Sequence, residues 1–127
     1  MPRGYKELVA DAETRVKSIS AEEAIQMASA DATVLVDLRD VRELKREGKI
    51  PGAFHCPRGL QEFWIDPQCT YHKPIFAEPK TFVFYCNLGW RSALAADIAQ
   101  QMGLQDVCHI AGGFDAWKAA GGEVETK

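Results

Sequence analysis

Short apolar runs alternate with longer charged segments along the chain. Aliphatic, β-branched and aromatic residues dominate residues 33–36, 81–85 and 107–110. A run without alternating polar positions is typical of a strand that is buried on both faces of a sheet. A fourth, shorter strand is predicted at residues 54–55, because the turn-forming sequence IPGA precedes it.

Helical patterns fill the segments between these strands. Ser20 and Glu23 have the spacing of a capping box, in which each side chain accepts a backbone amide at the start of a helix. Gly103 follows another helical segment as its expected C-cap. The pattern predicts helices over residues 4–17, 20–30, 37–47, 92–102 and 114–120.

Strands that alternate with helices predict an α/β fold, with a parallel sheet covered by helices on both faces. The length predicts one domain over residues 1–127, with residues 1–17 as an N-terminal helical extension. Residues 57–79 form a proline- and aromatic-rich insertion near the expected active site, with one helical turn around residues 60–64. An irregular stretch of that length is more often functional than filler.

Composition and charge limit the classes of function. The chain is 46% hydrophobic and 26% charged, and its net charge of −3 provides no attraction to nucleic acid or to an anionic membrane. No apolar segment is long enough to span a bilayer, and the N-terminus lacks the features of a secretory signal. The four cysteines and three histidines share no metal-ligand spacing, so neither a metal ion nor a cofactor is expected. Scattered free cysteines indicate a reducing compartment, and a cytoplasmic location is predicted.

Cys86 stands where the strand at residues 81–85 ends, and only a short loop separates it from the next helix. Ligands of parallel sheets bind at this edge, where loop amides and a helix N-terminus together attract negative charge. A thiol held there is expected to ionise readily, which makes Cys86 the predicted nucleophile. Gly89 gives the loop the freedom to aim its amides inward. The alternative is a buried cysteine that only fills the end of the strand.

Several polar residues around the loop are further candidates. Arg91 can tie the loop to a carboxylate behind it, and Ser92 can cap the helix or donate its hydroxyl to the Cys86 sulfur. Arg58 begins the sequence RGLQEFW, a candidate rim or lid over the pocket. There Arg58 either contacts an anionic donor or has only a surface role. Cys69 in the same insertion is either a resolving thiol or a bystander.

Three stretches together resemble the rhodanese family of sulfurtransferases: VLVDLRDVRELKREGKIPGAFHCPRG, FVFYCNLGWRS and HIAGGFDAWKAAGGEVE. They extend from about residue 34 to residue 124. The resemblance implies a five-stranded parallel sheet with helices on both faces and a catalytic cysteine in the strand-to-helix loop. It also implies that Cys86 takes a sulfane sulfur from a donor such as thiosulfate, becomes a persulfide, and passes the sulfur to cyanide, a small thiol or a protein thiol.

The number of residues in the loop separates sulfur transfer from phosphate chemistry. Sulfurtransferases of this family resemble the chain in having four residues between the cysteine and the arginine, here Cys86 and Arg91. Their phosphatase and arsenate-handling relatives use one residue more, because a tetrahedral oxyanion needs a wider ring of amides than a single sulfur atom. The spacing therefore favours sulfur transfer.

The chain also departs from the family pattern. Asn87 stands where some members carry a cation, which reduces the attraction for thiosulfate. Leu88 and Trp90 make the loop apolar and are expected to shield a persulfide from water. Asp37 and Arg39 match the family's Asp-x-Arg sequence and are expected to form a charge pair beside the loop, with Asp37 as a general base the alternative.

Two classes of function follow. The first is a sulfurtransferase in which Cys86 carries the sulfur and residues 87–92 stabilise it. The second is a non-catalytic rhodanese module that binds a partner and uses the fold as a scaffold. A phosphatase or an arsenate reductase is a third possible function, which the length of the loop between Cys86 and Arg91 disfavours.

Overall fold

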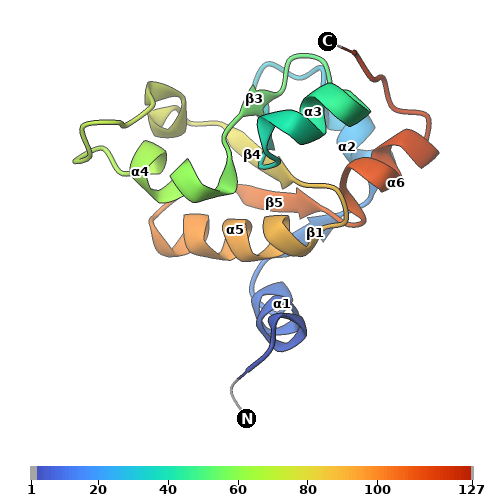
Figure 1. The fold of residues 1–127 in the computed structure, drawn as a ribbon. Coiled ribbons are helices and arrows are strands. Elements are labelled where there is room, and N and C mark those ends of the chain that lie inside the picture. The colour runs from blue at the N-terminus through green and yellow to red at the C-terminus, as the bar shows by residue number, and fades with distance from the viewer. Residues whose placement is uncertain (1–2, 127) are drawn as a thin grey trace.

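A five-stranded sheet forms the centre of the computed structural model, which describes residues 3–126 (Figure 1). The strand order is β1-β5-β4-β2-β3, and each pair of neighbouring strands is parallel. The strands are β1 (Lys17–Ile19), β2 (Thr33–Asp37), β3 (Phe54–His55), β4 (Thr81–Tyr85) and β5 (Val107–Ile110). The predicted five-stranded parallel sheet is confirmed.

Helices cover both faces of this sheet. Figure 1 shows α5 along one face, and α2, α3 and α6 on the other. The helices are α1 (Tyr5–Glu13), α2 (Ala21–Met27), α3 (Val41–Glu47), α4 (Gln61–Ile65), α5 (Trp90–Gln101) and α6 (Gly113–Ala119). Two short 3₁₀ segments, η1 (Arg58–Leu60) and η2 (Pro74–Ala77), lie in the insertion, which is therefore more regular than predicted.

The central strand β4 divides the core in two. Phe82 and Phe84 pack toward the alanine-rich face of α5, whereas Val83 and Tyr85 pack toward α2 and α6. All four side chains are at most 2% exposed. A strand with both faces buried needs no polar alternation, which explains why its sequence is a continuous apolar run.

The structure corrects three sequence-based boundaries, the first being that of the helix predicted over residues 4–17, which ends at Glu13 because Lys17 already belongs to β1. The helix predicted over residues 37–47 begins only at Val41, because Asp37 is the last residue of β2 and Asp40 caps the helix by accepting the Arg42 amide at 2.7 Å. The helix predicted from residue 92 begins two residues earlier. At α2 the Ser20 hydroxyl accepts the Glu23 amide at 3.1 Å, so the hydroxyl half of the predicted capping box is present.

Strand β1 has no counterpart in the apolar pattern. Only Ile19 of its three residues is buried, and it pairs with Ile110 of β5 at the edge of the sheet. A short edge strand buries too few side chains to leave a run in the sequence. The fifth strand was implied by the family resemblance alone.

A buried ion pair lies at the carboxyl end of β2. The Arg39 guanidinium donates to both carboxylate oxygens of Asp37 at 3.0 and 2.8 Å, and both side chains are at most 1% exposed. The Tyr85 hydroxyl donates to Asp37 at 2.8 Å, and burial together with the Asp37 charge raises the pKa of Tyr85, which keeps the hydroxyl protonated. Arg39 also donates to the Gly48 carbonyl and to Asn87 of the loop after β4. The structure thus contains the expected charge pair, and the pair joins β2, β4 and that loop.

We expect Asp37→Asn to lower the free energy of unfolding by about 3 kcal/mol, because it leaves the buried Arg39 charge without its counter-ion. Urea denaturation at neutral pH measures this change. Asp40→Asn is the matched control, since its side chain is 51% exposed and asparagine is also a good N-cap. Equal stabilities of the two variants would contradict the role given to the ion pair.

Candidate active site

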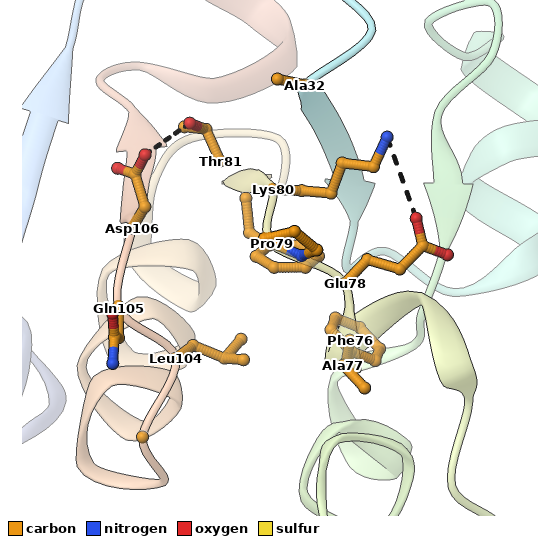
Figure 2. Close-up of a pocket in the computed structure, with 12 residues that line it drawn as sticks. Ala32, Phe76, Ala77, Glu78, Pro79, Lys80, Thr81, Leu104, Gln105 and Asp106 are labelled. Atoms are coloured by element: carbon orange, nitrogen blue, oxygen red, sulfur yellow. Dashed lines mark hydrogen bonds and ion pairs between the residues drawn. The ribbon is translucent and has the colours of Figure 1, made fainter.

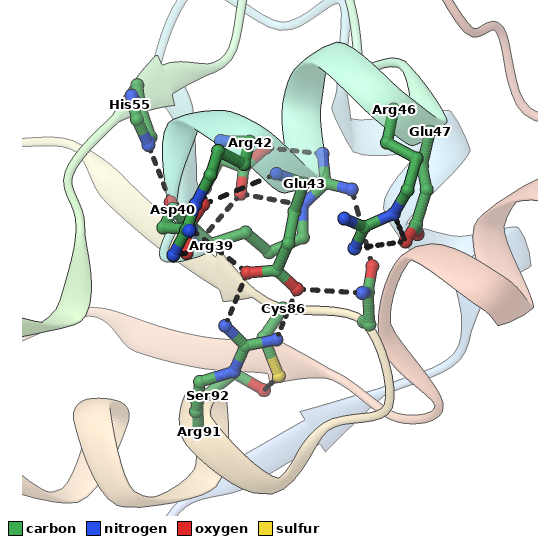
Figure 3. A network of polar contacts seen from close by, with 12 residues as sticks. Arg39, Asp40, Arg42, Glu43, Arg46, Glu47, His55, Cys86, Arg91 and Ser92 are labelled. Atoms are coloured by element: carbon green, nitrogen blue, oxygen red, sulfur yellow. Dashed lines mark hydrogen bonds and ion pairs between the residues drawn. The ribbon is translucent and has the colours of Figure 1, made fainter.

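Cys86 directly follows the central strand, at the edge of the sheet where β2 also ends. Asp37 and Tyr85, the last residues of β2 and β4, are register partners. The loop after β4 and the start of α3 therefore lie next to each other, as Figure 3 shows. This is the carboxyl edge of the strands, where the sequence placed the site.

The Cys86 sulfur is enclosed by the turn that leads into α5. The side chain is 1% exposed, and the Gly89 amide donates to Sγ at 3.2 Å. Gly89 caps α5 with a φ of +103°, a conformation that favours glycine. The Ser92 hydroxyl oxygen lies 3.8 Å from Sγ and accepts from the thiol. One amide, one hydroxyl and the N-terminus of a 12-residue helix thus surround the sulfur, where the sequence predicted several amides.

Glu43 of α3 binds two side chains of the loop after β4. Its carboxylate accepts two hydrogen bonds from Arg91, at 2.8 and 2.9 Å, and one from the Asn87 side chain at 2.9 Å (Figure 3). The Arg91 hydrogen bonds lower the pKa of Glu43, and Glu43 in turn raises the pKa of Arg91. Arg91 therefore ties the loop to a carboxylate, as expected, and that carboxylate is Glu43.

Sequence reasoning missed Glu43. It also accepts the Asp40 amide at 3.0 Å, so it completes the capping box of α3. The Asp-x-x-Glu spacing was visible in the sequence and signals this cap. Nothing local signals the contact with Arg91, which is 48 residues away along the chain.

The two cations beside the loop both have carboxylate partners. Arg91 faces Glu43, Arg39 faces Asp37, and Asn87 contributes no charge. Hydrogen-bond donors and the helix dipole act on negative charge at the site, together with Arg91, whose pKa is raised by Glu43 and also by Cys86.

Leu88 and Trp90 lie partly at the surface, at 51% and 50% exposed, whereas Cys86 is 1% exposed. That these two side chains cover a persulfide stays a prediction. Trp90 packs against Tyr5 of α1, with ring centroids 5.1 Å apart. These residues form an apolar rim on the outside of the loop, because the turn at Gly89 aims backbone groups, not side chains, at Cys86.

Helix α6 contacts the backbone of the loop after β4. The Phe114 amide donates to the Cys86 carbonyl at 2.7 Å, and the Asp115 amide donates to the Asn87 carbonyl at 3.2 Å. Gly113 begins this helix with a φ of +60°, and a Cβ atom there would lie 2.6 Å from the Asn87 carbonyl oxygen and clash with that of Cys86. Only glycine allows the helix to approach the loop this closely.

A second residue that the sequence analysis did not identify is His109 of β5. It is 1% exposed, and its Nδ1 atom lies 2.9 Å from the Ser92 hydroxyl. Burial lowers the pKa of His109. The available signal was one ionisable residue in the otherwise apolar run at residues 107–110.

Two candidates lie away from the loop. Arg58 pairs with Glu62 at 3.2 Å, one turn further along its own segment, rather than with the loop. Cys69 accepts the Tyr71 amide at 3.5 Å in the stretch between α4 and η2. Figure 1 places that stretch across the molecule from the turn between β4 and α5, which removes the geometric basis for a resolving thiol.

A hollow of about 610 Å³ lies at the amino ends of β4 and β5, with Lys80, Thr81 and Asp106 on its walls and Cys86 not among the residues that line it (Figure 2). Across residues 3–126, no group of three or more His, Cys, Asp or Glu side chains could hold a metal ion. Within the same residues, no helix has the length and apolar character needed to cross a membrane.

Comparison with known proteins gives consistent similarities in sequence. The family model described as a rhodanese-like domain matches residues 20–120. A Mus musculus protein named thiosulfate sulfurtransferase/rhodanese-like domain-containing protein 3 is 29% identical over 106 residues, 80% of this chain and 68% of that protein. The thiosulfate sulfurtransferase GlpE of Shewanella oneidensis is 31% identical over 104 residues, 82% of this chain and 94% of that protein.

A solved structure is more similar still. A protein of unknown function from Rhodopseudomonas palustris, described as a possible tyrosine phosphatase, is 53% identical with a TM-score of 0.95. The match covers 98% of this chain and 96% of that one. These descriptions name two different chemistries, so the geometry of the loop has to separate them.

We expect Gly113→Ala to disturb the loop as well as the fold, because the added methyl group would meet backbone oxygens of Cys86 and Asn87. The free energy of unfolding should fall by about 1–3 kcal/mol more than in the Gly121→Ala control, the cost of forcing a methyl group into a packed site. The rate of Cys86 alkylation should also change. Gly121→Ala is the control, since it has a similar φ of +86° with nothing within 4 Å of a Cβ. A Gly113 variant that differs from the control in neither measurement would contradict this role.

Proposed function

Because the chain belongs to the rhodanese-like family, we propose that it is a sulfurtransferase in which Cys86 carries the transferred sulfur as a persulfide. One observation supports this most directly: the Cys86 sulfur lies at the start of α5, 3.2 Å from the donating Gly89 amide. Those groups stabilise a thiolate and, one atom further out, a terminal persulfide sulfur.

The reaction takes two displacements at sulfur. The Cys86 thiolate attacks the sulfane sulfur of the donor, a new S–S bond forms, and the donor's leaving group departs with the electron pair of the broken bond. The acceptor, which is cyanide, a small thiolate or a protein thiolate, then attacks the outer sulfur. The S–S bond to Cys86 breaks, and the thiolate is restored.

The loop residues divide the supporting roles. The Gly89 amide and the Ser92 hydroxyl contact the sulfur, while Arg91 and Asn87 fix the loop through Glu43. The Asp37–Arg39 pair holds the sheet edge beneath it, with Asp37 already occupied as a counter-ion rather than available as a base. Arg58 has no place in this scheme, because it pairs with Glu62.

Sulfur transfer fits the loop better than phosphate chemistry. The four-residue spacing between Cys86 and Arg91 makes the loop short, and the Gly89 amide donates to the sulfur. In addition, both outer nitrogens of the Arg91 guanidinium donate to Glu43, so the fork that would bind two phosphate oxygens is occupied.

Charge at the site favours a persulfide donor over thiosulfate. Thiosulfate is a dianion, whereas the cations beside the loop are paired and Asn87 is neutral. The exposed apolar rim of Leu88 and Trp90 suits an acceptor with an apolar surface, such as a protein thiol. The free state of all four cysteines agrees with the proposed cytoplasmic location.

A non-catalytic binding module is the second candidate. The exposed rim supports it, since exposed aromatic residues often mark a docking surface. The complete loop around Cys86 favours the enzyme, because a scaffold does not require a cysteine held by an amide and a helix N-terminus.

We expect the reduced protein to gain one sulfur atom on Cys86 when it is incubated with a low-molecular-weight persulfide, and Cys86→Ser to gain none. Intact mass measures the gain, and cyanide should then release thiocyanate from the wild type alone. Cys69→Ser is the matched control and should behave as the wild type. If Cys86 gains no sulfur from persulfide or thiosulfate, the sulfurtransferase proposal is wrong and the binding module is favoured. Hydrolysis of a phosphate ester by the protein would instead support a phosphatase.

We expect Asn87→Lys to raise kcat/KM for thiosulfate about fivefold at low salt, because one cation about 4 Å from an anion is worth about 1 kcal/mol in water. Thiocyanate formation measures the rate. The gain should shrink at high salt, where charges are screened. Asn87→Gln is the neutral control, and an equal gain in that variant would contradict the electrostatic explanation.

A further inference from the structure

A chain of hydrogen-bonding side chains runs from Cys86 to the surface on the side away from the loop. The Cys86 thiol donates to the Ser92 hydroxyl at 3.8 Å, and that hydroxyl lies 2.9 Å from His109 Nδ1. His109 Nε2 lies 3.0 Å from the Ser18 hydroxyl of β1. Cys86, Ser92 and His109 are buried, whereas Ser18 is exposed.

We propose that His109 is a positioning residue for the Cys86 thiol: through Ser92 it receives the thiol proton, and through Ser18 it passes a proton to water. This inference rests on the proposed role of Cys86 as the nucleophile. It adds a residue outside the loop, on strand β5.

The protons balance between the thiol state and the thiolate state of Cys86. In the thiol state Cys86 donates to Ser92, Ser92 donates to Nδ1, and Nε2–H donates to Ser18. When the thiol ionises, its proton moves to Ser92, the Ser92 proton moves to Nδ1, the Nε2 proton moves to Ser18, and Ser18 releases one to water. The Ser92 hydroxyl then donates to the thiolate, and Nδ1–H donates to Ser92. Each of these three contacts is kept, and the imidazole is neutral before and after. The Gly89 carbonyl, 3.2 Å from the Ser92 hydroxyl, is a competing acceptor for the Ser92 proton in both states.

A neutral imidazole suits its surroundings. Burial lowers the pKa of His109, opposed by the Glu13 carboxylate of α1, which is the charged group acting on it. Its other neighbours are Ser18 of β1, Ser92 of α5 and its register partner Phe84 of β4. Since a charged imidazole is disfavoured there, the histidine works by exchanging its tautomer.

Alkylation of Cys86 by iodoacetamide as a function of pH tests the proposal without any sulfur transfer. Burial raises the pKa of Cys56 to about 12 and that of Cys108 to about 11, so both react slowly, and a Cys69→Ser background removes the remaining thiol. The assay therefore reports on Cys86 even if the chain proves not to transfer sulfur.

We expect His109→Phe to raise the midpoint of the pH profile by about one unit and to slow alkylation at pH 7 about tenfold, because the thiolate loses a polarised donor. His109→Asn can replace the contact at Nδ1 and should recover most of the rate. Ser18→Val, which keeps a strand-forming residue, should shift the midpoint the same way by a smaller amount. Ser29→Ala, an exposed serine remote from the chain of hydrogen bonds, should match the background.

Thermal unfolding of each variant separates this effect from loss of structure. A folded His109→Phe variant with an unshifted profile would overturn the proposal. If that variant does not fold, Ser18→Val decides: a raised midpoint supports the proposal, and an unshifted profile overturns it.

Discussion

The contact between Glu43 and the loop after β4 is the interaction on which the candidate site depends. One carboxylate accepts two hydrogen bonds from Arg91, one from Asn87 and one from the amide that starts α3. It therefore couples the loop to the helix that follows β2. Charge-assisted, bidentate hydrogen bonds have a fixed geometry, so the position of the loop follows from the position of α3.

The same contact sets the electrostatics of the site. Because Arg91 is held by Glu43 and Arg39 by Asp37, each of these charges is paired with a carboxylate. Arg91 is the charged group that also acts on the Cys86 sulfur, and the neutral donors beside the sulfur are the Gly89 amide, the Ser92 hydroxyl and the start of α5. Such donors act over a short range, which suits a group as small as one transferred sulfur atom.

The apolar cores make this arrangement rigid. Strand β4 is buried on both faces, and α6 presses against the loop through Gly113. The same parallel register that buries β4 places His109 of β5 behind Ser92. A polar residue in a buried strand needs a partner, and the partner it finds is part of the site.

The sequence by itself determined the fold class, four of the five strands and the place of Cys86 at the carboxyl end of β4, because these depend on apolar runs and on neighbours in the chain. It also contains the spacing from Cys86 to Arg91 that supports the proposed sulfur transfer through the family resemblance, since that spacing is local. Only the tertiary structure decided the partners of Arg91 and Ser92, the strand β1 and the outward side chain of Trp90. Glu43 lies 48 residues from Arg91, and His109 lies 17 from Ser92. Contacts at such separations are set by how the strands pair and the helices pack, which no local pattern encodes.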